Sequence, residues 1–195
     1  MAGANVWGRI VANALAQLQP TIINEEGTRR AEKLAHWLSP NHGPPLGEHK
    51  QTSNALVDVP DCDYIVNGGV GAIFKNDLLS LPRKGMLNAH PGLLPEYRGL
   101  DPVCWALSNH DPQGATVHFI DEGIDTGPIL IRRPLKETSA QSLVDLRLEV
   151  LEFAARLTRE FLSDPEAHPP MAQRPEEGNY YGRFENPGAL DAFFE

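Results

Sequence analysis

Short apolar runs alternate along this chain with longer segments of helical periodicity, and this alternation is the feature that most constrains the fold. Strands are predicted at residues 21–23, 63–66, 86–88, 115–120 and 129–133. Helices are predicted at residues 6–18, 28–38, 101–110 and 139–162, with one or two helical turns at 75–81. Strands that alternate with helices form a parallel or mostly parallel sheet with helices on both faces. The sequence therefore predicts an α/β fold.

The sequence marks the last predicted helix clearly, whereas the N-terminal segment departs from the expected order of elements. Residues 139–162 make the clearest helix, with Ser139 predicted as its N-cap. Its apolar stripe is formed by Leu143, Leu146, Val150, Ala154, Leu157 and Phe161. Near the N-terminus, a turn of small residues at 2–5 directly precedes the helix at 6–18, as it would after a buried strand. No such strand precedes it in the sequence, so we expect the first strand of the sheet to be missing.

Composition and charge narrow the class of protein. The 195 residues carry a net charge of −9, and a surface of this sign repels phosphate backbones and anionic membranes. Cys62 and Cys104 do not have the spacing of metal ligands. Two scattered thiols are more typical of a protein whose cysteines are reduced, and the alternative is one disulfide between them. No apolar run approaches the roughly 20 residues that span a bilayer, and residues 1–18 lack the pattern of a signal peptide. We predict a cytoplasmic protein that binds neither nucleic acid nor membrane.

Three polar segments follow predicted strands, where ligands collect in a parallel sheet. Residues 67–72 (NGGVGA) contain three glycines that let backbone approach a flat ligand, although glycine after a strand is common in any sheet protein. The other two segments are residues 88–99 (NAHPGLLPEYRG) and residues 121–128 (DEGIDTGP). We expect the side chains of Asn88, His90 and Asp125 to converge at one edge of the sheet.

These last two segments carry groups that suit acyl transfer. Asn88 and His90 are two residues apart, so on an extended strand their side chains point to the same side. A carboxamide can stabilise a developing oxyanion, and an imidazole can move protons near neutral pH. The Asp125 carboxylate would orient the His90 ring and raise its pKa. The alternatives are that Asn88 and His90 satisfy turn backbone, and that Asp125 and Thr126 cap their own loop.

Taken together, these blocks resemble the folate-dependent formyltransferases. That family includes glycinamide ribonucleotide transformylase, the catalytic domain of methionyl-tRNA formyltransferase, sugar N-formyltransferases and formyltetrahydrofolate deformylase. The resemblance is carried by residues 88–99 and 114–130 (GATVHFIDEGIDTGPIL), and it extends from about residue 2 to residue 162. It implies a Rossmann-like sheet and a catalytic domain over residues 1–162, followed by a C-terminal extension at 163–195.

The resemblance also implies a mechanism and a set of site residues. Asn88, His90 and Asp125 match the catalytic triad of the family. Asn88 and protonated His90 would stabilise the oxyanion formed when an amine attacks the formyl carbon of 10-formyltetrahydrofolate, and Asp125 would hold His90 charged. No metal is implied. The residues that match the folate-binding segments are Gly71, Ala72, Ile73, Phe74, Asp121, Glu122 and Gly123.

The acceptor is less well defined. We expect a small-molecule amine, such as an amino sugar nucleotide, an amino acid derivative or a purine precursor. The acidic surface disfavours a tRNA acceptor, and the resemblance does not extend to the C-terminal β-barrel-like domain of the tRNA enzyme. Two alternatives remain open. One is a 10-formyltetrahydrofolate hydrolase that uses the same triad, and the other is a catalytically idle domain that binds folate or a partner.

We also predict the environment of several residues outside the triad. His118 lies within a predicted strand and is expected to be structural. Arg98 is expected to be a solvated loop arginine, with contact to an acceptor phosphate or carboxylate as the alternative. In the tail, Tyr180, Tyr181 and Phe184 are expected to pack on the sheet edge. The alternative for this aromatic group is a self-association surface that would make a homodimer.

Overall fold

The structure is a computed structural model that describes residues 6–18, 23–25, 50–52, 61–68, 79–174 and 176–195. The chain divides into two compact units, Met1–Asn88 and Ala89–Glu195. The predicted helix at 28–38 lies outside the described residues. Strand β4 (Gly85–His90) crosses the division, so its last two residues belong to the second unit.

The first unit pairs its described strands in parallel. Its elements are α1 (Val6–Ala14), η1 (Ala16–Leu18), β1 (Ile23–Glu25), β2 (Lys50–Thr52), β3 (Tyr64–Asn67) and most of β4. β1 pairs with β2, and β3 pairs with β4. The predicted helix at 6–18 is confirmed over α1, which buries Ile10 and Val11, and the chain then tightens into the 3₁₀ turn η1.

The β3–β4 pair carries a buried apolar layer in the first unit. Ile65 and Val66 of β3 and Met86 and Leu87 of β4 are all buried. The register pairs Asn67 with Asn88, so these two side chains come from neighbouring positions on adjacent strands. The strands predicted at 63–66 and 86–88 are therefore confirmed.

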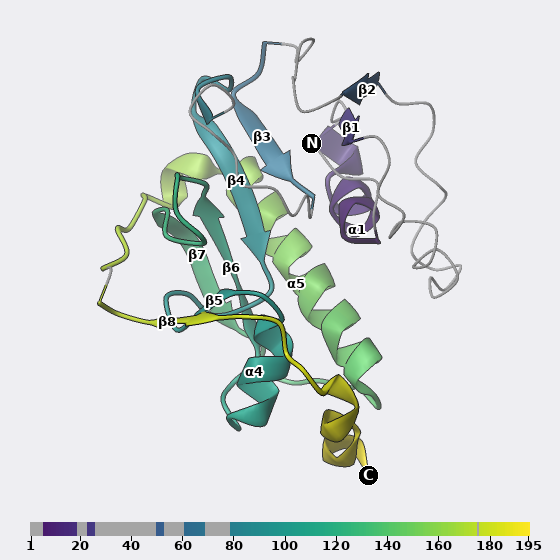
Figure 1. The fold of residues 1–195 in the computed structure, drawn as a ribbon. Coiled ribbons are helices and arrows are strands. Elements are labelled where there is room, and N and C mark those ends of the chain that lie inside the picture. Colours follow the sequence, from purple (N-terminus) through teal and green to yellow (C-terminus); the bar gives the residue numbers. More distant parts are fainter. Residues whose placement is uncertain (1–5, 19–22, 26–49, 53–60, 69–78, 175) are drawn as a thin grey trace. The chain divides into compact units, whose positions relative to one another are not determined.

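The second unit contains a long helix, an antiparallel strand pair and a tail that adds a further strand. Its elements are β5 (Tyr97–Gly99), α4 (Pro102–Ser108), β6 (Gly114–Phe119), β7 (Ile129–Pro134), α5 (Leu143–Ser163), η3 (Pro165–Ala167), β8 (Asn179–Tyr181) and η4 (Pro187–Phe194). β6 pairs with β7 in antiparallel fashion, and β5 pairs with β8 in parallel. Helix α5 packs along β6 and β7 (Figure 1).

The β6–β7 pair is irregular at one point. Val117 lies opposite Ile131, but His118 lies opposite Ile129, so the register shifts between Val117 and His118. Such a bulge bends the strand and re-aims the side chains beside it. The irregularity immediately precedes the loop that joins the two strands and that carries Asp125.

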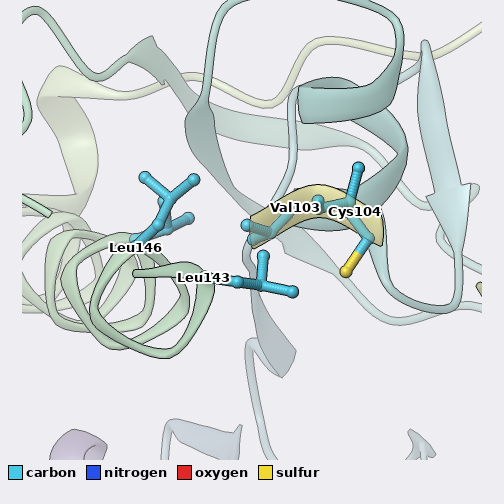
Figure 2. Packing of buried hydrophobic residues seen from close by; sticks show 6 residues of the cluster. Val103, Cys104, Leu143 and Leu146 are labelled. Atoms are coloured by element: carbon cyan, nitrogen blue, oxygen red, sulfur yellow. The ribbon is translucent and has the colours of Figure 1, made fainter. Parts of the chain in front are cut away.

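A hydrophobic cluster joins helices α4 and α5. Val103 and Cys104 of α4 face Leu143 and Leu146 of α5 (Figure 2). Leu190, from η4 near the C-terminus, is buried in the same cluster. The cluster therefore includes part of the stripe predicted for the long helix, together with a residue of the tail.

Helix α5 begins later than the sequence predicts. Its N-cap is Ser142, whose hydroxyl accepts a hydrogen bond from the Asp145 N–H at 3.1 Å. The prediction of Ser139 as the cap is wrong. The chain just before Ser142 is held outside the helix, because the Thr138 hydroxyl accepts the Ala140 N–H at 3.1 Å and donates to Glu149 at 2.6 Å.

Two aromatic residues of the tail pack on β5 and α4. The Tyr181 ring stacks on Tyr97, with centroids 5.4 Å apart, and lies 4.9 Å from Trp105. Phe184 meets Trp105 edge-on at 4.8 Å. Packing against strand β5 is confirmed for Tyr181, whereas Phe184 packs on helix α4 and Tyr180 remains largely exposed. Within the described ranges, no helix combines the length and apolarity needed to cross a membrane.

The α4–α5 cluster generates a stability prediction. Leu146→Ala removes buried methyl groups and should lower the free energy of unfolding by about 2–5 kcal/mol. Val144→Ala, at an exposed position of the same helix, should change it by no more than about 0.5 kcal/mol. Urea denaturation followed by circular dichroism measures both values. Equal losses in the two variants would contradict the packing described here.

Candidate active site

The segment that follows β4 is held by one buried hydroxyl. Thr116 of β6 donates to the Gly92 carbonyl at 2.7 Å and accepts from the Leu94 N–H at 3.1 Å. A Cβ atom added at Gly92 would lie only 2.9 Å from His90 Nε2 and 2.7 Å from Pro102 Cβ. The loop therefore packs directly on the His90 ring and limits where that ring can lie.

His90 ends β4, and its buried side chain has a defined tautomer. Its Nε2 lies 2.7 Å from the Tyr97 carbonyl oxygen. Because a carbonyl only accepts, Nε2 carries the proton and donates it. The other ring nitrogen, Nδ1, lies 3.6 Å from Asp125 Oδ2. In the neutral ring, the unprotonated nitrogen therefore faces the carboxylate.

Asp125 lies in the loop between β6 and β7 and contacts three separate segments. Its Oδ2 accepts the Gly99 N–H at 2.8 Å and faces His90. Its Oδ1 lies 3.6 Å from His118 Nε2. The Asp125 backbone is left-handed, with φ of 54°. One mostly buried carboxylate thus lies between two histidine rings and a backbone N–H.

Burial and the neighbouring groups together set the pKa values of His90 and Asp125. Burial lowers the pKa of His90, and the attraction of the Asp125 carboxylate offsets only part of that effect. The Asp125 carboxylate does favour the charged ring, as expected, but burial outweighs this effect and the pKa of His90 falls. Burial tends to raise the pKa of Asp125, but His90, His118 and the Gly99 N–H together hold it well below its usual range. At neutral pH the structure holds an ionised Asp125 beside a neutral His90.

His118 belongs to this cluster, although the sequence alone did not place it there. Its Nδ1 lies 2.8 Å from the Phe119 carbonyl, so that nitrogen is the donor and Nε2 faces Asp125. The His90 and His118 rings meet edge-on, with centroids 6.2 Å apart. The sequence feature that could have indicated this is the two-residue spacing of Thr116 and His118, because it puts both polar side chains on one face of β6.

The rest of the acidic loop is closed by its own hydrogen bonds. Asp121 accepts the Thr126 hydroxyl at 2.7 Å and the Gly123 N–H at 3.0 Å. Glu122 and Gly123 are exposed. Of the predicted folate-binding residues, these loop positions are described, while residues 71–74 lie outside the described ranges.

Asn88 lies in the first unit, two residues before His90 on the same strand. The Asn67 side-chain NH₂ donates to Asn88 Oδ1 at 3.3 Å. This contact links the two side-chain amides across the strand pair. Asn67 was included in the glycine-rich segment of the sequence, but its role as a partner of Asn88 emerges only from the strand register.

The expectation that Arg98 is a solvated loop arginine is wrong. Its side chain is buried and donates to Gln173 Oε1, at 2.9 Å from Nη2, and to the Arg174 carbonyl at 3.3 Å. The guanidinium also lies 5.4 Å from the centre of the Tyr180 ring. The tail covers this arginine. In the part of the chain that the structure describes, no group of three or more His, Cys, Asp or Glu side chains is arranged to hold a metal ion.

Comparison with known proteins establishes the family. The family described as Formyl transferase matches residues 8–160, and the chain belongs to this family. The curated methionyl-tRNA formyltransferase of Rhizorhabdus wittichii is 36% identical over 156 residues, which make up 78% of this chain and 48% of that protein. The chain spans about half the length of the curated relatives it matches.

Solved structures confirm the predicted fold class. A sugar N-formyltransferase from a Shewanella species matches with a TM-score of 0.66 at 20% identity, over 93% of this chain and 74% of that one. The formyltransferase PseJ from Anoxybacillus kamchatkensis, solved with a formamido UDP-sugar and tetrahydrofolate, matches with a TM-score of 0.57 at 21% identity. That match covers 86% of this chain and 87% of the other. The α/β formyltransferase fold expected from the sequence is correct.

The lowered pKa of His90 predicts a specific pH dependence of stability. Below 6.5, the ordinary value for histidine, the unfolded chain takes up a proton that folded His90 accepts only at lower pH. The free energy of unfolding should therefore fall between about pH 7.5 and about pH 5.5. The effect of Asp125 lies at lower pH, because its unfolded value is 3.8.

Urea denaturation across this range checks the prediction. In His90→Gln the decrease should be smaller than in the wild type, because the variant lacks the buried titrating ring. His110→Gln, which replaces an exposed histidine, should keep the wild-type slope. An identical slope in the wild type and His90→Gln would show that another group is responsible.

Proposed function

We propose that this chain transfers a formyl group from 10-formyltetrahydrofolate to the primary amine of a small-molecule acceptor. The observation that carries the proposal is the buried pair of His90 and Asp125, with Nδ1 and Oδ2 3.6 Å apart. Membership of the formyl transferase family supports the reaction class. Asn88, two residues before His90, supplies the carboxamide that completes the proposed triad.

The proposed reaction forms one bond and breaks one. The formyl donor supplies an activated carbonyl carbon; the acceptor nitrogen bonds to that carbon, and the carbon separates from N10 of the folate. One proton leaves the amine and one reaches N10, so the products are a formamide and tetrahydrofolate. Asn88 and the His90 ring donate hydrogen bonds to the carbonyl oxygen as negative charge develops there.

At the start of the proposed reaction the His90 ring is neutral, because burial lowers its pKa. The ring nitrogen that can take up a proton is Nδ1, which faces Asp125, and the carboxylate stabilises the imidazolium that results. The charged ring is then the stronger hydrogen-bond donor through Nε2. His90 Nε2 donates to the Tyr97 carbonyl in this structure. Substrate binding must therefore divert that donor, or share it, before it can serve the formyl oxygen.

We extend the proposal to the donor site and the domain limits. Residues 1–162 form the proposed catalytic domain, and residues 163–195 its extension. The exposed loop that leads to Asp125 supports a role in donor binding, since a ligand on this loop would be close to the proposed catalytic carboxylate. The proposed folate contacts are Gly71, Ala72, Ile73, Phe74, Asp121, Glu122 and Gly123.

The acceptor is proposed to be a small amine rather than a tRNA. A net charge of −9 disfavours the broad phosphate contacts that tRNA binding needs. The curated relatives that the chain matches are named methionyl-tRNA formyltransferases. Methionyl-tRNA is therefore the competing acceptor to be tested beside small amines.

A single assay separates the candidate functions. The chain is incubated with 10-formyltetrahydrofolate and, in turn, an amino sugar nucleotide, an amino acid derivative, a purine precursor amine and methionyl-tRNA. Released tetrahydrofolate is followed by absorbance, and the formylated product by mass spectrometry. We expect a formamide with one of the small amines. Release of tetrahydrofolate without any amine indicates a hydrolase. Formylation of the tRNA alone overturns the small-amine assignment. Binding of 10-formyltetrahydrofolate without turnover indicates an idle domain.

The proposed oxyanion donor can be tested separately from folding. Asn88→Ala should lower kcat by about 10²–10³-fold, because one donor to the developing charge is lost. Asn186→Ala, an exposed asparagine whose side chain makes no cap hydrogen bond, is the matched control and should keep wild-type kcat. Thermal unfolding of both variants should match the wild type within a few degrees. Wild-type kcat in Asn88→Ala would remove this residue from the mechanism.

A further inference from the structure

Gln173 lies beyond the residues matched by the family and is bonded on both ends of its amide. Its Oε1 accepts from Arg98 Nε at 3.2 Å and from Arg98 Nη2 at 2.9 Å. Its Nε2 donates to the Asp125 carbonyl at 2.9 Å and to the Gly127 carbonyl at 2.7 Å. The orientation of the amide follows from chemistry, since guanidinium groups only donate and carbonyls only accept.

These four bonds connect the two segments that hold the Asp125 carboxylate. Gly99, whose N–H donates to Asp125 Oδ2, directly follows Arg98 in the chain. Asp125 and Gly127 belong to the loop that presents the carboxylate. One side-chain amide therefore links Arg98, the neighbour of Gly99 in the chain, to the loop that carries Asp125.

The Asp125 backbone needs such support. A φ of 54° is uncommon for a residue with a side chain, and it persists only where the surroundings hold it. The hydrogen bonds from Gln173 fall on the carbonyl of this residue and on that of Gly127, two residues later. They act on the part of the loop that sets where the carboxylate points.

Gln173 is itself anchored nearby. Met171 and Ile129 exchange two backbone hydrogen bonds, both 2.8 Å long, so the tail is fixed at the start of β7. The partly buried Gln173 follows two residues later. Its position thus depends on the same strand that ends the Asp125 loop.

We infer that Gln173 is a positioning residue for Asp125, and that the C-terminal extension thereby helps to hold the proposed catalytic carboxylate in place. The inference rests on the proposed role of Asp125. Gln173 does not touch the reacting atoms in this scheme. It holds the carboxylate beside His90 through the loop backbone and through Arg98.

Gln173→Glu isolates the contact to the loop. A carboxylate has the same shape and still accepts from Arg98, but it cannot donate to the Asp125 and Gly127 carbonyls. Two acceptors would then face each other, so the loop should move while the Arg98 side stays in place. Gln173→Leu removes both sides. Gln141→Glu makes the same chemical change at an exposed position and serves as the matched control.

Kinetics in the full chain form the first readout. Gln173→Glu should lower kcat by about tenfold or more, as expected for a small displacement of a catalytic group. The KM for 10-formyltetrahydrofolate should stay within about twofold, since uniform binding is not removed. Gln141→Glu should leave both constants at the wild-type value. An unchanged kcat in Gln173→Glu, or a loss explained by a fall in thermal stability, would overturn the inference.

Two readouts remain valid if the chain shows no formyl transfer. In protein labelled with ¹⁵N-histidine, the ring signals of His90, assigned through His90→Gln, should shift in Gln173→Glu and not in Gln141→Glu. Hydrogen exchange should increase over residues 121–128 in Gln173→Glu, and over both this loop and residues 97–99 in Gln173→Leu. An inactive wild type with these shifts would refute the proposed function and leave Gln173 as the residue that positions Asp125. Unchanged His90 signals and unchanged exchange would refute the positioning role itself.

Discussion

The contact between the Asp125 carboxylate and two buried histidines is the interaction on which the rest of the site depends. Ionised carboxylates are costly to bury unless charges or hydrogen-bond donors compensate them. Asp125 has the Gly99 N–H on one oxygen and faces His90 and His118 at 3.6 Å each. Both rings use their other nitrogen on a backbone carbonyl, at Tyr97 and at Phe119. The Asp125 carboxylate is therefore the group that the two rings have in common.

The surrounding fold supplies the geometry that this contact requires. Thr116 holds the loop that packs on His90, and the irregular register at His118 occurs just before the Asp125 loop. The tail then returns through Met171 and Gln173 to bond the loop from the other side. The segment 163–195 is thus structurally continuous with the second unit, and Leu190 is part of its core.

Much of the fold was predictable because it follows from local patterns. The α/β class, the strands β3, β4, β6 and β7 and the helix α5 are all indicated by periodicity and apolar runs. The start of α5 was not, because two serines three residues apart offer the same local cap and only the structure distinguishes them. The burial of Arg98 was equally hidden, since the residues that cover it lie about 75 positions later in the chain.

The sequence by itself determined which groups are available for the proposed chemistry: a carboxamide, an imidazole and a carboxylate in two specific blocks, at Asn88, His90 and Asp125. Only the tertiary structure decided which groups meet and in which charge state. It joined His118 to Asp125, paired Asn67 with Asn88, and lowered the His90 pKa through burial rather than raising it. The physical reason is that residue identity fixes what a group can donate or accept. Desolvation and contact depend on segments that are distant in sequence and become neighbours only when the chain folds.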